Sequence, residues 1–239
     1  MIYEKNKYND TRPNAGVTIV PFIYDNGVIK VLVYKRDKNS EVFQSYYSLP
    51  NRFFNITEFS NLDDAANYAL EEKTNVSIPN INQFYTFSGS YIDPTRILTL
   101  NVCYYSILRK SEVISVNNDD PFEKEWMPVN DALNLTLAFN HNEVLKLAYE
   151  KLLNSAEYTI TPLFLLDEDF TITEMRNLTE ILLGEKLDNS RFRDRIKKSG
   201  VLIESENKIG KVSNRPAQLY KINPSYKGCF YPKSVTKSK

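Results

Sequence analysis

The chain of 239 residues has few of the residues from which metal centres and thiol sites are built. Its two cysteines, Cys103 and Cys229, form neither a disulfide framework nor a zinc motif, so a reducing cytoplasm is expected. A single histidine, His141, argues against histidine-based metal or nucleophile chemistry. No apolar run approaches the ~18 residues of a membrane helix, and the polar start MIYEKNKYND lacks the apolar core of a signal peptide. We therefore expect no cofactor, no metal and no membrane partner.

The chain as a whole also has no net charge, because it contains 30 Lys+Arg and 30 Asp+Glu residues. The two signs of charge are nevertheless unevenly distributed along it. Residues 185–239 hold 14 basic and 5 acidic side chains, a net charge of +9. The remaining 184 residues hold 16 basic and 25 acidic side chains, a net charge of −9. A basic part joined to an acidic part predicts that the first binds nucleic acid and that the second has another task.

The acidic part mixes strand and helix patterns. Asn26-Gly27 within the run 17–36 predicts a hairpin, because both residues tolerate a positive φ. The other patterns predict helices over residues 62–73 and 143–153 and strands over 81–91 and 97–108. Residues 154–162 break the last helix and end at a proline, so we expect domains over 1–157 and 158–239.

The basic part has the order of a winged helix-turn-helix. Thr171-Ile-Thr-Glu174 is a capping box, and the helix that it begins ends at Gly184. Asp188 caps a second helix that ends near Ser199-Gly200, and strands are expected over 201–204 and 218–222. The alternative is a solvated helix with a cationic face. The order of the elements, with the charge confined to them, favours DNA binding.

The second of these helices has an apolar face of Phe192 and Ile196 and a basic outer face, as a major-groove recognition helix needs. Asp194 also points outward, where it can accept from cytosine or orient an arginine. The candidate DNA contacts are Asn189, Ser190, Arg191, Arg193 and Lys197 on the helix and Arg215 in the hairpin.

The acidic part resembles the Nudix fold in its hairpin, in LPNRF and in a helix that contains AANYALEEKTNV. The basic part resembles the Nudix-related transcriptional regulators of the NrtR-like family in FTITEMRNLTEILLGEKLDNSRFRDRIKKSG and NRPAQLYKI. SYIDPTRILTLNVCYYSIL and LAFNHNEVL are also similar to that family, and the resemblance covers most of residues 12–222. It implies an α+β fold, in which a Nudix-like mixed sheet with helices precedes a C-terminal winged helix-turn-helix.

The Nudix signature, Gly-x5-Glu-x7-Arg-Glu-U-x-Glu-Glu-x-Gly-U with U aliphatic, is degenerate here. Carboxylates of that signature hold Mg²⁺ against a pyrophosphate. Tyr68-Ala69 stand in place of Arg-Glu, Glu72-Lys73 in place of Glu-Glu, and Asn75 in place of the final glycine. Ser60 falls at the first glutamate, with Glu58 nearby. We interpret this half as a Nudix fold without catalytic or metal-binding residues, and the protein as no enzyme.

Regulators of this family use the inactive domain to sense a small molecule, which is ADP-ribose in one branch and a sugar such as arabinose in others. By position, the resemblance implies ligand contacts at Arg36, Phe53 and Arg96, since arginine suits a phosphate or ribose hydroxyl and Phe53 can stack on a ring. The structural alternatives are a solvated Arg36, a core Phe53 and an Arg96 paired with Asp93. His141 matches a family histidine before a linker helix, where a helix-start or interdomain contact is expected.

Together these features predict a cytoplasmic repressor, a homodimer on a double-stranded DNA operator, whose effector is a nucleotide-sugar or a sugar. The dimer and the repression are implied by the resemblance alone. A first alternative is a divergent Mg²⁺-dependent Nudix hydrolase of a nucleoside diphosphate derivative, with a site rebuilt from Glu58, Glu71 and Glu72. A second is a protein-interaction module with a basic tail, which would not distinguish specific from random DNA.

Overall fold

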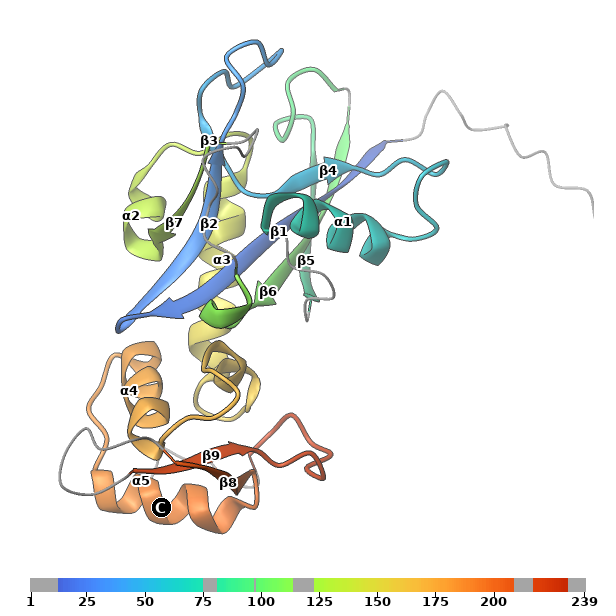
Figure 1. Ribbon diagram of the computed structural model, residues 1–239. Helices are drawn as coiled ribbons and strands as arrows, with labels where there is room; N and C mark the ends of the chain where they lie inside the picture. Colours follow the sequence, from blue (N-terminus) through green and yellow to red (C-terminus); the bar gives the residue numbers. More distant parts are fainter. Residues whose placement is uncertain (1–12, 75–80, 97, 114–122, 209–216, 232–239) are drawn as a thin grey trace, which may run out of the picture.

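The structure is a computed structural model that describes residues 13–74, 81–96, 98–113, 123–208 and 217–231. Along the chain, the strands and helices of the large sheet come first, and the helices and the two-stranded sheet of the basic part come last (Figure 1). The strands and helices of the first part are β1 (Asn14–Asp25), β2 (Val28–Lys35), β3 (Tyr47–Ser48), β4 (Asn51–Phe53), α1 (Leu62–Thr74), β5 (Ile81–Gly89), β6 (Thr99–Ile107), η2 (Lys110–Glu112), β7 (Lys124–Pro128), α2 (Val129–Asn134) and α3 (His141–Ser155). Those of the second part are η3 (Thr161–Leu165), α4 (Ile172–Leu183), α5 (Asn189–Ser199), β8 (Leu202–Lys208) and β9 (Gln218–Ile222).

The first part is a seven-stranded mixed sheet built around the long strand β1. One edge of β1 pairs antiparallel with β4 near its start and with β2 near its end. Its other edge pairs in parallel with β6, which in turn carries β5. Asn26 and Gly27 join β1 to β2 with φ of 50° and 84°, so the predicted hairpin is confirmed.

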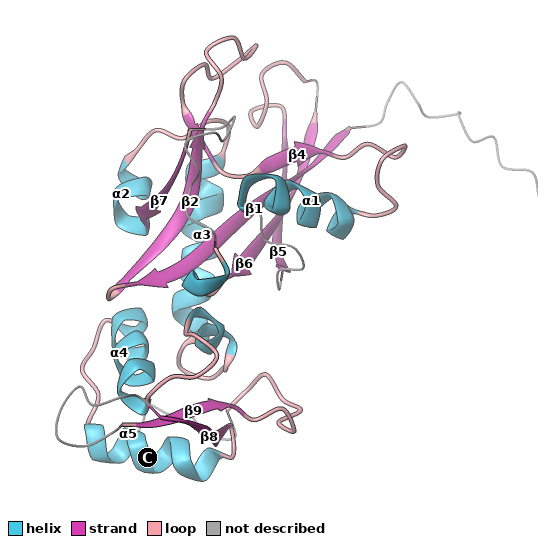
Figure 2. Cartoon of the chain, in the orientation of Figure 1, coloured by secondary structure: helices cyan, strands magenta, loops and turns pink. Residues whose placement is uncertain are grey.

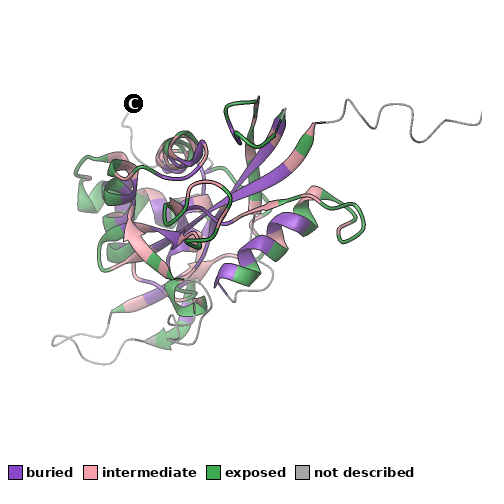
Figure 3. Cartoon of the chain, turned by 90° about the horizontal axis from the view of Figure 1, so that it is seen from above, coloured by how far each residue is buried: buried purple, intermediate pink, exposed green. Residues whose placement is uncertain are grey.

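Helices cover both faces of the sheet because the residues of β1 alternate in direction. Val17 and Ile19 pack under α1 in one buried cluster, whereas Val20 and Phe22 belong to the cluster that includes α3. The central strands are therefore buried along most of their length, while the helices are exposed on their outer sides (Figure 3). Within the described residues, no helix has the length and apolar character needed to cross a membrane.

The winged helix begins and ends where its local signals predict. The Thr171 hydroxyl accepts from the Glu174 amide at 3.1 Å, and the Glu174 carboxylate accepts from the Thr171 amide at 2.7 Å. Asp188 accepts from the Arg191 amide at 2.8 Å. Gly184 and Gly200 end α4 and α5 with φ of 69° and 72°, in the left-handed region that glycine tolerates.

The two parts share one hydrophobic cluster. It runs from the sheet through Ile160, Leu163 and Phe170 to Phe192 and other apolar side chains of the winged helix. The backbone segments 158–160 and 229–231 also pair, through the Ile160 amide to the Cys229 carbonyl and the Tyr231 amide to the Tyr158 carbonyl, both at 2.8 Å. The winged helix is therefore packed against the first part rather than tethered to it.

Several elements differ from the expectation. No local pattern predicts β4 or β7, which have 3 and 5 residues, or the 6-residue α2. β4 and β7 form because β1 and β2 offer free edges to them, a tertiary cause that local patterns do not contain. Strand β8 extends to Lys208, beyond the predicted end at residue 204.

Candidate effector pocket and DNA-binding surface

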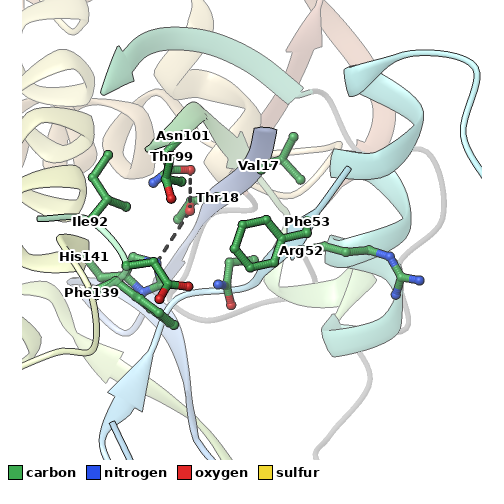
Figure 4. Close-up of a pocket in the computed structure, with 12 residues that line it drawn as sticks. Val17, Thr18, Arg52, Phe53, Ile92, Thr99, Asn101, Phe139 and His141 are labelled. Atoms are coloured by element: carbon green, nitrogen blue, oxygen red, sulfur yellow. Dashed lines mark hydrogen bonds between the residues drawn. The ribbon is translucent and has the colours of Figure 1, made fainter. Parts of the chain in front are cut away.

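A pocket lies where β1, β4, β6 and the start of α3 meet (Figure 4). Its lining residues include Thr18, Asn51, Phe53, Thr99, Asn101 and Phe139. The backbone approach that forms it depends on Gly16, since a Cβ there would lie 3.2 Å from the Arg52 carbonyl oxygen. A side chain at position 16 would thus require the backbone of β1 or β4 to shift by a few tenths of an ångström beside Phe53.

His141 joins the start of α3 to the sheet beneath this pocket. Its Nδ1 accepts from the Leu49 amide at 3.1 Å, so Nε2 carries the proton and faces the Thr18 hydroxyl at 3.5 Å. The imidazole is buried, and burial together with the charge of Arg36 lowers the pKa of His141 to about 3. His141 is therefore a neutral structural group at a helix start, one of the two roles expected from the sequence.

The same polar chain ends at Asn140, and Thr99, which lines the pocket, lies on the same strand as Asn101. Thr18 donates to Asn101 at 2.9 Å, and Asn101 donates to Asn140 at 3.3 Å. Asn140 Nδ2 and Thr99 Oγ1 are buried, yet neither has a hydrogen-bond partner among the described residues. An unpaired buried polar atom is costly, so these atoms are suited to meet polar atoms of a ligand. Thr99 and Asn101 were not predicted as site residues, although two polar residues at spacing two within an apolar strand are a usable signal.

The three candidate ligand residues all contact an aromatic ring of this pocket or provide one. Phe53 lines it and is 41% exposed, so it is not a core residue. The Arg96 guanidinium lies 5.0 Å from the centroid of the Phe53 ring, and Asp93 bonds to Thr95 rather than to that guanidinium. Arg36 lies 4.7 Å over the ring of Phe139.

Arg36 is also held in place by the loop that follows β2. Its guanidinium donates to the Val42 carbonyl from Nε at 3.3 Å and from Nη2 at 3.2 Å. It is therefore not a solvated strand end. Phe139, on whose ring Arg36 stacks, lines the pocket. Its φ of 56° is an uncommon backbone conformation for a residue other than glycine.

The residues that replace the Nudix signature do not fit Mg²⁺, which prefers six oxygen ligands. Glu58 pairs with Arg52 at 2.6 Å, and this contact lowers the pKa of Glu58. Glu72 pairs with Lys73 at 3.4 Å. In the described parts of the chain, no group of three or more His, Cys, Asp or Glu side chains is placed to hold a metal ion.

Helix α5 presents an exposed basic face at the end of the molecule far from the sheet (Figure 2). Only Phe192 and Ile196 of this helix are buried, as predicted. The candidate contacts on the helix, namely Asn189, Ser190, Arg191, Arg193 and Lys197, are exposed. Within the described residues, no carboxylate pairs with the basic side chains of α5. Arg215 lies outside the described residues.

A buried carboxylate that the sequence analysis missed fixes the turn before α5. Glu180 of α4 is 8% exposed and accepts from the Leu187 amide at 3.1 Å and from Lys186 Nζ at 2.9 Å. Lys186 and the Leu187 amide lower the pKa of Glu180, so it stays ionised. Because Leu187 precedes the N-cap of α5, Glu180 ties the start of this helix to α4. A lone glutamate in a helical pattern gives no sign of such a contact.

Two elements run from the pocket to the helix-turn-helix. Strand β1 lines the pocket near its start, at Gly16. Near its far end, Tyr24 borders a groove that is also lined by Gly27 of the hairpin and Glu180 of α4. Helix α3 begins at His141 and packs against α4 (Figure 1). The pocket is thus joined to the basic helix through packed structure.

Comparisons with known proteins agree with this architecture. A family model described as the NrtR DNA-binding winged helix domain matches residues 162–222. The ADPR responsive transcriptional repressor NtrR of Acinetobacter baylyi is 33% identical over 222 residues, which are 92% of this chain and 85% of that protein. The chain belongs to the NrtR family.

Two crystal structures of Shewanella oneidensis NrtR extend the likeness to three dimensions. The structure complexed with a 27mer DNA is 29% identical, covers 92% of this chain and 98% of that chain, and has a TM-score of 0.80. Its NUDIX domain complexed with ADP ribose is 25% identical, covers 63% of this chain and 99% of that chain, and has a TM-score of 0.51. The predicted fold of an NrtR-like protein, a Nudix-like mixed sheet followed by a winged helix-turn-helix, is confirmed.

Proposed function

We propose that this NrtR-family protein is a transcriptional repressor that binds an operator through α5. The observation that carries the proposal is the basic face of α5, which pairs with no carboxylate among the described residues; the helix is anchored by Phe192 and Ile196 and fixed by Glu180. Guanidinium and ammonium groups without carboxylate partners are available to phosphates and base edges. The likeness to the Shewanella oneidensis protein, whose crystal structure is complexed with a 27mer DNA, supports DNA binding.

The effector is a nucleotide-sugar such as ADP-ribose, or a related sugar, bound in the pocket. Two aromatic rings, Phe53 and Phe139, suit a planar base, and Arg36 and Arg96 suit phosphates or ribose hydroxyls. Thr99 Oγ1, which lines the pocket and has no hydrogen-bond partner among the described residues, suits a hydroxyl group. The relative from Acinetobacter baylyi is named for its response to ADPR, and a NUDIX domain of this family is complexed with ADP ribose.

Binding of the effector changes the spacing of two α5 helices in a homodimer. Half-sites that lie one turn apart on DNA are separated by ~34 Å, so a small change of angle breaks the fit. In this arrangement residues 1–157 are the sensor and 158–239 the DNA-binding domain, and the protein acts in the cytoplasm. Hydrolysis forms no part of the function, because Glu58 and Glu72 are engaged by Arg52 and Lys73 rather than poised for a metal.

Selection from genomic DNA tests the proposal. Purified full-length protein is incubated with fragmented genomic DNA at near-physiological salt, and the retained fragments are sequenced. A few enriched sites with an inverted repeat are expected, and ADP-ribose should change their retention. Uniform, salt-sensitive retention would instead reduce the basic face to a nonspecific patch. The hydrolase alternative requires Mg²⁺-dependent phosphate release that disappears in Glu72→Gln.

Removing the Phe53 ring should weaken effector binding. In Phe53→Ala the affinity for ADP-ribose, measured by calorimetry, is expected to fall about two- to tenfold, because a stacked ring contributes ~0.5–1.5 kcal/mol beyond its area. Ile56→Ala, which truncates an apolar side chain that is 79% exposed, is the matched control. Equal affinities in the two variants would remove Phe53 from the effector site.

A further inference from the structure

Residues 223–231, which follow β9, form a strap across the junction between the two parts of the molecule (Figure 1). The match to the NrtR winged helix domain ends at residue 222, so the strap lies beyond that match. Residues 158–160 and 229–231 pair antiparallel through two main-chain hydrogen bonds of 2.8 Å. The Tyr231 side chain is 8% exposed and belongs to the hydrophobic cluster that the two parts share. One end of the strap is therefore fixed to the segment that follows α3.

The other end of the strap is fixed to the end of α5. Asn223 donates from Nδ2 to the Gly200 carbonyl at 3.0 Å and from its amide to the Val201 carbonyl at 2.8 Å. The last carbonyls of a helix have no partner within it, and the Asn223 side chain supplies one. Since Gly200 is the C-cap of α5, Asn223 holds the C-terminal end of this helix.

Hydrogen bonds within the strap hold its two ends at a fixed separation. Asn223 Oδ1 accepts from the Ser225 amide at 3.0 Å, and the Asn223 carbonyl accepts from the Tyr226 amide at 2.9 Å. The Tyr226 hydroxyl donates to the Phe230 carbonyl, and Tyr226 packs against the shared cluster. A segment that is bonded internally and packed along its length passes a displacement on, whereas a slack loop absorbs it.

Helix α5 is consequently attached at both ends. At its N-terminal end, Glu180 of α4 accepts from the Leu187 amide at 3.1 Å. At its C-terminal end, the strap leads to residues 158–160 and so to α3, whose first residue, His141, lines the pocket. A helix attached at one end can turn about that end, but a helix attached at both ends must follow the two bodies that hold it.

We propose that residues 223–231 couple the effector pocket to α5, so that a displacement of α3 changes the direction of the DNA-binding helix. The inference rests on the proposed function and names the segment through which effector and operator act on each other. A coupling of this kind is reciprocal, because each ligand must change the affinity of the other by the same factor. Loss of the strap should therefore leave both ligands bound but make their binding nearly independent.

Two shortened chains test the proposal. A chain of residues 1–231 retains the strap, and a chain of residues 1–227 lacks its contacts with residues 158–160. The two differ only by residues 228–231, which carry no charge, so their electrostatic attraction to DNA is matched. Operator affinity is measured by fluorescence anisotropy with and without saturating ADP-ribose.

The strap should determine how strongly ADP-ribose acts on the operator. In the wild type and in the chain 1–231, ADP-ribose should change operator affinity about fivefold or more, the lower end of the usual range of allosteric coupling. In the chain 1–227 this change should fall below about twofold, while the affinity for each ligand alone stays within about threefold of the wild type. The reverse titration, ADP-ribose by calorimetry with and without operator, should give the same factors. An undiminished effect in the chain 1–227 would overturn the proposal.

Asn223→Ala in the full-length chain covers the case in which the chain 1–227 does not fold. It removes the side-chain contact with Gly200, leaves Tyr231 in place, and should reduce the effect of ADP-ribose on operator affinity by about twofold or more. Asn207→Ala is the matched control, because Asn207 Nδ2 donates to Asp169 at 2.6 Å at the opposite end of β8 from the strap. Equal effects of ADP-ribose in the wild type and both variants would contradict the proposal.

Amide hydrogen exchange separates the strap from the proposed function. In the chain 1–227, exchange at residues 199–202 should be about threefold or more faster than in the chain 1–231, although Asn223 is present in both. If the wild type selects no operator or does not respond to ADP-ribose, the proposed function fails, and unchanged exchange at residues 199–202 would overturn the strap as well. If the wild type and the chain 1–227 respond equally, the strap fails and the proposed function stands.

Discussion

Arg193→Ala is expected to weaken operator binding by about 1–3 kcal/mol, or roughly five- to 150-fold. Arg193 lies on the exposed face of α5, next to the buried anchor Phe192, and no carboxylate of the described chain pairs with it. A guanidinium in that position can bond to the O6 and N7 atoms of guanine or to a phosphate. Fluorescence anisotropy with a labelled operator at constant salt measures the change.

The pattern of the loss identifies the contact. If Arg193 reads a guanine, random DNA binds equally well to the variant and the wild type, whereas a phosphate contact weakens both DNAs and reduces the salt slope by about one. Lys146→Ala removes a basic side chain far from α5 and serves as the control. Operator binding that survives intact in Arg193→Ala would place this residue outside the recognition surface.

Acid should destabilise the protein in a window that belongs to His141. The pKa of this buried imidazole is lowered from 6.5 to about 3, so the unfolded chain takes up a proton near pH 6.5 while the folded chain does not. The contribution of His141 to the free energy of unfolding is therefore fully present above pH 6.5 and is lost as the pH falls. Between pH 7 and pH 5 the free energy of unfolding should fall by about 2 kcal/mol from this group, as measured by urea denaturation.

The chain has one histidine, which makes the assignment direct. In His141→Gln the dependence on pH between 7 and 5 should disappear, whatever the absolute stability of the variant. In the folded wild type, the imidazole proton resonances should not shift above pH 5. A titration near pH 6.5 in the folded state would show that burial and the charge of Arg36 do not hold His141 neutral.

The predictable part of the fold is the part that local chemistry determines. Asn26-Gly27, the Thr171–Glu174 box, Gly184 and Gly200 each act within a few residues, and each lies where it was expected. Strands β4 and β7 are different, because they exist only as partners for the edges of β1 and β2. Their sequences are too short to specify a strand alone.

The site residues also fall into a group that local patterns predict and a group that they do not. The outward direction of Arg193 and the inward direction of Phe192 follow from helical periodicity, so the recognition face was predictable. The link between Thr18 and His141 joins residues 123 positions apart, and Glu180 acts by reaching a backbone amide across a turn. No pattern of spacing contains such contacts. For Arg36 and Arg96, the resemblance indicated the residues, and the structure places each against an aromatic ring.

The shared hydrophobic cluster bears on how this protein could be rearranged. Leu163 and Phe170, which follow the sensor, are buried together with Val20 and Val144 of the sheet and α3. The winged helix is therefore not an independent module that could be transferred to another protein without change. A chimera that joined it to a foreign sensor would present an apolar surface without its complement, unless the recipient carried the matching face of α3 as well. New specificities should be easier to obtain by exchanging the exposed residues of α5 than by exchanging domains.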